Sequence, residues 1–207
     1  MIRWLSGIAL GFLFLAYILL SPSLLFNLGL IIIFGIAIYE LIKLRVLSLQ
    51  SLLSFIFIGS AILFLYFYEF ERSLILIAVL ISVITDAFAF FAGKAFGRNK
   101  IFPNISPNKT LEGTIGGIVS SVVINSLLVI LIFQNSLKTF DAFMLILIIF
   151  ISAVASVLGD LLISSIKRQA NLKDTGSLIP GHGGLLDRID SHLLCIPVFF
   201  ILFEALQ

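Results

Sequence analysis

The sequence has little of what many small enzymes and binding domains depend on, with one cysteine, two histidines and only 12% charged residues among its 207 residues. With Cys195 alone, the chain can form neither an internal disulfide nor a cysteine-rich metal site. Two histidines and one cysteine also fit the usual ligand shell of zinc poorly. Because the few charges leave no soluble basic domain, no nucleic-acid partner is expected.

The sequence instead contains long apolar runs. Apolar residues make up 60% of the chain, and the mean hydropathy is +1.22. Since roughly 20 apolar residues in a helix cross the hydrocarbon core of a bilayer, these runs predict an all-α, polytopic integral membrane protein. Seven membrane-spanning helices are predicted, near residues 4–20, 24–42, 52–70, 73–93, 113–134, 140–166 and 191–207. The sixth run would measure about 40 Å as one helix, so we expect its last turns, around Asp160, to project beyond the hydrocarbon.

The basic residues are distributed unequally between the two membrane faces of this topology. With a cytoplasmic N-terminus, only Arg72 and Lys138 of the 13 lysines and arginines fall on the outer side. This bias supports an odd number of spans. Positive charge on the cytoplasmic face would attract anionic lipids or phosphorylated metabolites, so we expect membrane lipid as a partner and a site on that face.

Two polar segments interrupt the apolar sequence, and both lie in its C-terminal part. They are residues 85–117 and residues 160–190. We therefore predict an N-terminal membrane region with three helices, residues 1–72, and a catalytic membrane region, residues 73–207, that carries both segments.

The first polar segment begins inside the fourth apolar run. An ionised Asp86 there costs on the order of 3 kcal/mol or more, so we expect it to face a partner or a watery cavity. Further on, a helix start with Lys109 beside it offers N–H donors and positive charge, which favours a phosphate. Two simpler interpretations stay open: Asp86 pairs with a polar group of another helix, and Thr110 caps an ordinary helix whose glycines serve packing.

The second polar segment is rich in cations. Lys167, Arg168 and Lys173 suit phosphate oxygens, and the planar guanidinium of arginine can bind two of them. The glycines and proline of residues 180–184 allow the backbone to approach a ligand closely. The simpler alternative is a solvated, charged loop that only sets the membrane topology.

The acids near these cations have the spacing of a shared site. Ser156, Asp160 and Ser164 recur every four residues and therefore line one helix face. Asp187 and Asp190 are three residues apart, so on a helix both carboxylates also share a face. Together the three aspartates offer the oxygen ligands that Mg²⁺ prefers. Cations beside a magnesium site indicate phosphoryl or nucleotidyl transfer.

With these residues in view, the second segment resembles the signature of the phosphatidate cytidylyltransferases, also called CDP-diacylglycerol synthases. Its matching positions are Ser164, Lys167, Arg168, Lys173, Asp174, Gly176, Pro180, His182, Gly183, Gly184, Asp187, Arg188 and Asp190. The first segment is similar to the same family at Thr85, Asp86, Ser106, Pro107, Lys109, Thr110, Glu112, Gly113, Gly116 and Gly117. Phe90 and Leu111 depart from it, since tyrosine and tryptophan are frequent there, and Phe90 lacks the hydroxyl group that a tyrosine would offer for a hydrogen bond. The resemblance covers about residues 80–207.

The resemblance implies transfer of CMP from CTP to phosphatidate in the presence of Mg²⁺, giving CDP-diacylglycerol and pyrophosphate for phospholipid synthesis. It also implies a homodimer and, in a bacterium, the inner membrane. We expect Mg²⁺ to be held by Asp160, Asp187 and Asp190. The expected catalytic residues are Lys167, Arg168, Lys173, Asp174, His182 and Arg188. The expected substrate-binding residues are Asp86, Ser106, Lys109, Thr110, Glu112, Gly116, Gly117, Ser164, Gly183 and Gly184.

Three rival functions are open at this stage. A related membrane transferase would act on another lipid, such as an ether lipid or a polyprenol. An ion transporter would place Asp86 and Asp160 on an ion path, but it would not need the cations and acids of residues 167–190 at fixed spacing. An inactive structural member of the family would not need intact acids and cations.

Overall fold

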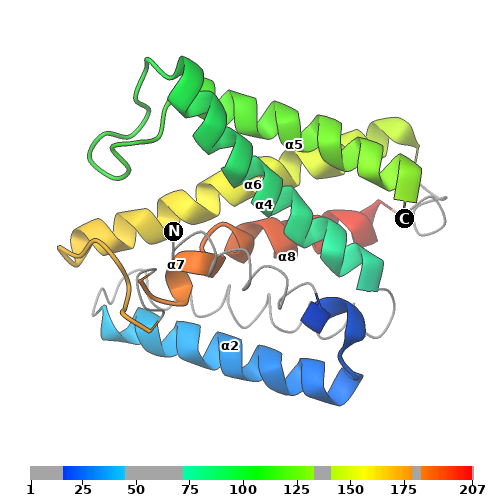
Figure 1. Ribbon diagram of the computed structural model, residues 1–207, viewed down its shortest axis with the longest axis horizontal. Helices are drawn as coiled ribbons and strands as arrows, with labels where there is room; N and C mark the ends of the chain where they lie inside the picture. The colour runs from blue at the N-terminus through cyan, green and yellow to red at the C-terminus, as the bar shows by residue number, and fades with distance from the viewer. Residues whose placement is uncertain (1–15, 45–71, 133–140, 179–182, 207) are drawn as a thin grey trace.

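The computed structural model describes residues 16–44, 72–132, 141–178 and 183–206, and its regular structure in these ranges is helical (Figure 1). The main helices are α2 (Ser23–Lys43), α4 (Arg72–Phe96), α5 (Leu111–Ile132), α6 (Ala142–Gln169), the short α7 (Leu186–Ile189) and α8 (His192–Ala205). Within the same ranges, Lys100 and Thr110 form an isolated antiparallel bridge. The predicted all-α class is confirmed for this part of the chain.

Four of these helices are long and apolar enough to cross a membrane. They are α2, α4, α5 over Leu111–Leu131, and α6. They correspond to the predicted spans 24–42, 73–93, 113–134 and 140–166. The predicted last span, 191–207, contains α8, an apolar helix of only 14 residues with Pro197 inside it. The predicted spans 4–20 and 52–70 lie outside the described residues except for residues 16–20, so the count of seven and the cytoplasmic N-terminus stay predictions.

Helices α4 and α5 pack closely because glycine replaces larger side chains along their contact. A Cβ added at Gly113 would lie 2.8 Å from the carbonyl oxygen of Ala89, and one at Gly117 would lie 2.5 Å from that of Thr85. A Cβ at Gly116 would lie 2.5 Å from the Cβ of Ala92. Small residues that let two backbones approach are typical of helix pairs in membranes. These glycines therefore serve helix packing, whereas the predicted contact of Gly116 and Gly117 with substrate stays a prediction.

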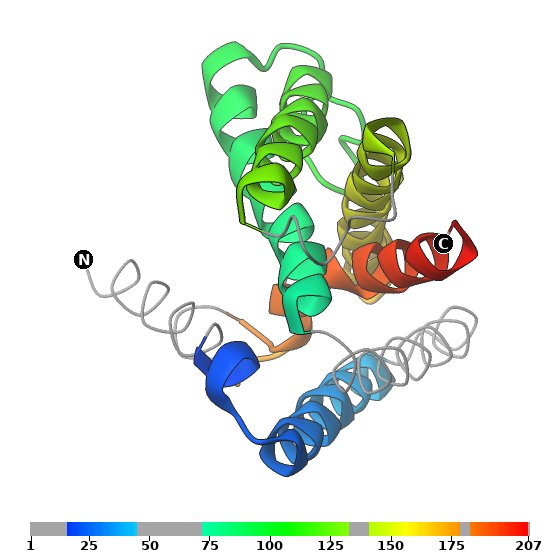
Figure 2. The same ribbon diagram turned by 90° about the vertical axis from the view of Figure 1, so that its right-hand side faces the viewer.

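Phe26 and Leu30, in the N-terminal half of helix α2, join a buried cluster with residues of α4, α6 and α8, whereas the C-terminal half of α2 packs against the second polar segment (Figure 2). Its contribution to a buried apolar cluster comes from Ala37, Leu41 and Leu44, and the other buried members come from α6, α7 and α8. Those partners are Ile163, Ile166, Leu186 and Leu193. This cluster brings the end of α2 beside α7, which contains Asp187 and is directly followed by Asp190.

Candidate active site

The two polar segments, which are far apart in the sequence, meet around the C-terminal half of α6. Lys109 Nζ, from the first segment, lies 2.7 Å from Asp160 Oδ2 of α6. Arg168 Nε donates a 3.1 Å hydrogen bond to the carbonyl oxygen of Ile105. The hydroxyl of Ser191 donates to Asp86 Oδ2. The first two contacts join the two segments, and the third comes from the residue directly after the second segment, as the prediction of one shared site expects.

Asp160 is held on α6 by groups from both sides. Besides the ion pair with Lys109, it accepts a 3.3 Å hydrogen bond at Oδ1 from the hydroxyl of Ser164, one turn further along the helix. Lys109 Nζ also lies 3.4 Å from the carbonyl oxygen of Val157. Ser156, one turn before Asp160, is buried and lies 3.0 Å, hydroxyl to hydroxyl, from Ser82 of α4. The predicted polar face of this helix therefore points into the protein.

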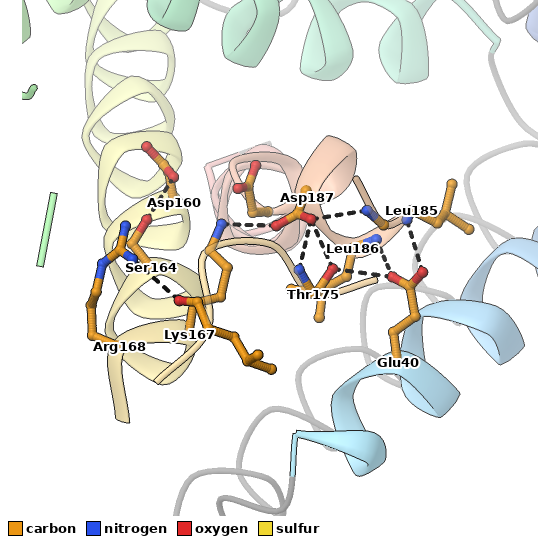
Figure 3. A network of polar contacts seen from close by, with 12 residues as sticks. Glu40, Asp160, Ser164, Lys167, Arg168, Thr175, Leu185, Leu186 and Asp187 are labelled. Atoms are coloured by element: carbon orange, nitrogen blue, oxygen red, sulfur yellow. Dashed lines mark hydrogen bonds and ion pairs between the residues drawn. The ribbon is translucent and has the colours of Figure 1, made fainter. Parts of the chain in front are cut away.

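Asp187 is the most fully bonded acid of the second segment (Figure 3). Its Oδ1 accepts a 2.8 Å bond from Lys167 Nζ, and its Oδ2 accepts bonds from the N–H groups of Thr175 at 2.8 Å and Gly184 at 3.0 Å. The Thr175 hydroxyl donates to the same oxygen at 3.0 Å. Although burial opposes ionisation, the bonds from Lys167 and from the two backbone groups hold the pKa of Asp187 below its ordinary value.

Asp190 is half-buried and has a different environment from Asp187. It accepts a 2.9 Å bond from the N–H of Ser191. Its approach to α6 depends on Gly159, because a Cβ there would lie 2.6 Å from the carbonyl oxygen of Asp190. Burial, followed by repulsion from the Asp160 carboxylate, raises the pKa of Asp190. Asp160 and Asp190 thus carry carboxylates that can serve as oxygen ligands of a cation, and the negative charges of the two carboxylates repel each other.

The three aspartates predicted to bind Mg²⁺ do not form one cluster. Among the described residues, no group of three or more His, Cys, Asp or Glu side chains has a geometry that could hold a metal ion. Asp187 fits a metal poorly, because Lys167 and three other donors already occupy its oxygens. Asp160 and Asp190 fit Mg²⁺ better, since this ion needs only one or two carboxylates together with water and substrate phosphates, and a cation would relieve their repulsion. The predicted Mg²⁺ dependence stays a prediction.

Other residues predicted for the first segment organise its backbone. Thr110 Oγ1 accepts a 3.2 Å bond from the N–H of Gly113, as the capping interpretation expects. Glu112 Oε2 accepts a 3.0 Å bond from the N–H of Arg98, and its Oε1 accepts a 2.9 Å bond from the side chain of Asn99. Ser106 closes a turn, since its carbonyl oxygen accepts from the N–H of Lys109 at 3.2 Å. No described contact tests substrate binding by these residues.

The remaining residues predicted for the second segment are mostly exposed. Arg168, Lys173, Asp174 and Arg188 are all exposed, and Arg168 also donates through Nη1 to the carbonyl oxygen of Leu172 at 3.2 Å. Gly183 has φ +85°, a conformation that favours glycine. His182 lies outside the described residues, so its predicted role stays a prediction.

Glu40 of α2 was missed by the sequence analysis. It is 5% exposed and accepts hydrogen bonds from the N–H groups of Leu185 and Leu186, and the hydroxyl oxygen of Thr175 lies 3.3 Å from its Oε2 (Figure 3). A signal was available, because Glu40 is the one charged residue in the predicted span 24–42. An ionisable side chain in such a run is a functional candidate by default.

A family model and the similar known proteins indicate the same family. The model of the cytidylyltransferase family matches residues 48–206. A phosphatidate cytidylyltransferase of Staphylococcus haemolyticus (strain JCSC1435) is 38% identical over 142 residues, which cover 67% of this chain and 53% of the relative. The Staphylococcus epidermidis enzyme of the same name (strain ATCC 12228 / FDA PCI 1200) is 40% identical over 142 residues, covering 67% of this chain and 53% of the relative.

The corresponding relative from Bacillus subtilis (strain 168), also a phosphatidate cytidylyltransferase, is 44% identical over 120 residues, covering 57% of this chain and 42% of the relative. The chain thus spans about half the length of the curated relatives that it matches. Glu40 precedes the matched residues 48–206.

Proposed function

The chain belongs to the cytidylyltransferase family, and we propose that it transfers CMP from CTP to phosphatidate, releasing pyrophosphate and forming CDP-diacylglycerol. The observation that carries this proposal is the meeting of the two polar segments at the Lys109–Asp160 pair. In this contact, cations from separate parts of the sequence lie beside partly buried acids at the ends of apolar helices. A reaction between a lipid phosphate and a nucleoside triphosphate needs a charged site of this kind beside the membrane-spanning helices.

The chemistry requires control of charge more than a strong base. A phosphate oxygen of phosphatidate forms a bond to the α-phosphorus of CTP, while the bond from that phosphorus to pyrophosphate breaks and its electron pair leaves with pyrophosphate. The attacking oxygen is already an anion, so the main barrier is repulsion between two anionic substrates. Fixed cations lower that barrier without reorganising during the reaction.

The cations of the site divide into two groups. Lys109 and Lys167 are already oriented by carboxylates, at 2.7 Å and 2.8 Å, and so are held in defined positions. Lys173 and Arg188 are exposed on the second segment, and their positive charge suits the phosphates of a nucleotide. We propose that the first pair fixes the reacting phosphates and that the second pair captures CTP.

The aspartates of the site have two different roles in this proposal. Asp160 and Asp190 would hold Mg²⁺, which when bound neutralises charge on the CTP phosphates. Asp187 instead keeps Lys167 and the Thr175 backbone in place. We also propose that the site faces the cytoplasm, where CTP is available, while phosphatidate enters from the bilayer, and that the protein is a homodimer.

The test is transfer by the purified full chain. Incubation with CTP labelled at the α-phosphate, Mg²⁺ and phosphatidate is expected to give labelled CDP-diacylglycerol and unlabelled pyrophosphate. An ether-lipid phosphate and a polyprenyl phosphate serve as parallel substrates, and preferred labelling of either would replace phosphatidate in the proposal. Absence of labelled lipid and of pyrophosphate with every lipid would overturn the proposed function.

A further inference from the structure

Glu40 is a buried carboxylate that reaches the second polar segment from the other end of the sequence. Its Oε1 accepts a 3.1 Å bond from the N–H of Leu185, and its Oε2 accepts a 2.8 Å bond from the N–H of Leu186. The hydroxyl of Thr175 lies 3.3 Å from the same Oε2. Both carboxylate oxygens are thus engaged by a segment that lies 135 to 146 residues further along the chain.

Two glycines of the segment leave the space that this carboxylate occupies. A Cβ added at Gly184 would lie 2.6 Å from Glu40 Oε2, and one at Gly176 would lie 2.7 Å from Glu40 Oε1. Real Cβ atoms essentially never approach another atom that closely. Glycine at both positions is therefore explained by the entry of Glu40 between them, without a ligand.

The contacts of Glu40 lead directly to Asp187. Leu185 and Leu186 immediately precede Asp187, so their bonds to Glu40 fix the backbone from which that side chain projects. The Thr175 hydroxyl lies between the two carboxylates, 3.3 Å from Glu40 and 3.0 Å from Asp187 Oδ2. Asp187 in turn holds Lys167 Nζ at 2.8 Å. The position of a proposed phosphate-binding lysine is thereby tied to a residue of α2.

We propose that Glu40 is a positioning residue of the active site, which fixes the backbone at residues 185–186 and through it the Asp187–Lys167 pair. This role rests on the proposed function, because it concerns the placement of Lys167 for cytidylyl transfer. Glu40 touches no reacting group itself. It extends the site to the N-terminal region, residues 1–72, which the sequence analysis had separated from catalysis.

The first experiment measures the position of the segment without using activity. Glu40→Gln keeps the size of the side chain but turns one acceptor oxygen into an amide donor, which faces N–H donors. In the full chain, hydrogen–deuterium exchange of the peptide containing Leu185 and Leu186 is expected to become at least about tenfold faster, while exchange in α4 and α5 is unchanged. Glu204→Gln, at an exposed site of α8, is the matched control and is expected to match the wild type.

The second experiment measures catalysis on folded protein of equal concentration. Misplacement of a catalytic group by about 1 Å lowers the rate about 100-fold, so Glu40→Gln is expected to lower kcat by about 10- to 100-fold. The KM for CTP is expected to change less than kcat, because Lys173, one of the two exposed cations proposed to capture CTP, lies outside the loosened residues. Glu40→Asp restores both acceptor oxygens and is expected to recover part of kcat. Glu204→Gln is expected to retain the wild-type kcat.

The two readouts separate the possible failures. Wild-type exchange at Leu185 and Leu186 in Glu40→Gln would overturn the inference, as would faster exchange throughout the chain, which would make Glu40 a residue of general stability. Wild-type kcat in the presence of local loosening would also overturn it. If the wild type forms no CDP-diacylglycerol, the proposed function fails, and the positioning role in that reaction fails with it, whereas the exchange result still decides whether Glu40 fixes the segment.

Discussion

Lys167 Nζ and Asp187 Oδ1 lie 2.8 Å apart, and their side chains are only 10% and 7% exposed. A buried pair of this kind cannot lose one member without leaving the other charge desolvated. Because Lys167 stands on α6 and Asp187 on α7, the pair also joins a long helix to the segment that Glu40 holds. It is therefore both a structural link and a means of placing a cation.

This pair predicts strong coupling in a double-mutant cycle. Asp187→Ala or Lys167→Ala alone is expected to destabilise the protein by about 3–5 kcal/mol, because each leaves an unpaired buried charge. Replacing both is expected to lower stability by less than the sum of the single changes. The free energy of unfolding, measured in mild detergent with increasing denaturant, checks this. Additive effects would show that the two side chains do not interact.

The lowered pKa of Asp187 predicts a pH dependence of stability. A carboxyl whose pKa is lower in the folded than in the unfolded protein stabilises the fold above its unfolded pKa, about 3.9, and this contribution is lost as the pH falls. The difference in melting temperature between the wild type and Asp187→Asn is therefore expected to be constant near neutral pH and to shrink below about pH 4. Thermal unfolding from pH 3 to pH 7 measures it. A difference that stays the same across this range would contradict the prediction.

Asp160 predicts a loss of activity with little loss of stability. It is 24% exposed and forms its ion pair with Lys109, which is 20% exposed, so water can solvate either partner alone. If Asp160 holds Mg²⁺, Asp160→Asn is expected to lower CDP-diacylglycerol formation about 100-fold and to shift the melting temperature by no more than about 3 °C. Asp141→Asn, an exposed acid at the start of the same helix, is the control and is expected to keep full activity. Equal activity of the two variants would remove Asp160 from the site.

The space that Gly184 leaves predicts a position-specific effect of a single methyl group. A Cβ there would lie 2.3 Å from Thr175 Oγ1 and 2.6 Å from Glu40 Oε2, so Gly184→Ala must displace both side chains. We expect a loss of about 1–3 kcal/mol of stability together with a fall in activity. Gly35→Ala in α2 has no neighbouring atom within 4 Å and is expected to be neutral or to stabilise the helix by up to about 1 kcal/mol. Thermal unfolding of the two variants side by side decides between these expectations.

Patterns of local sequence were enough for the helices and for part of the site. Apolar length predicted α2, α4, α5 and α6, and a spacing of four predicted the polar face of α6 around Asp160. Helical periodicity is a property of neighbouring residues, so it can be read from the chain. The two polar segments were expected to lie close together, because the distribution of lysines and arginines assigned both segments to the same face of the membrane.

The partners of individual acids could not be predicted in this way. Asp187 was expected to bind metal, but its oxygens are taken by Lys167 and by N–H groups of its own segment, which depend on how that segment folds back. Glu40 bonds to residues more than 130 positions away, and no local pattern specifies such a contact. Only the isolated charge in an apolar run marked Glu40 in advance.

The bonds that Arg168 donates to the carbonyl oxygens of Ile105 and Leu172 have a consequence for how the sequence can vary. A main-chain carbonyl is present whatever the side chain, so substitution at residue 105 or 172 leaves the acceptor in place. The donor has no such freedom, because it needs a planar guanidinium that can reach two acceptors at once. Evolutionary constraint on this junction of the two polar segments therefore falls on Arg168. Substitutions at residues 105 and 172 leave both hydrogen bonds intact.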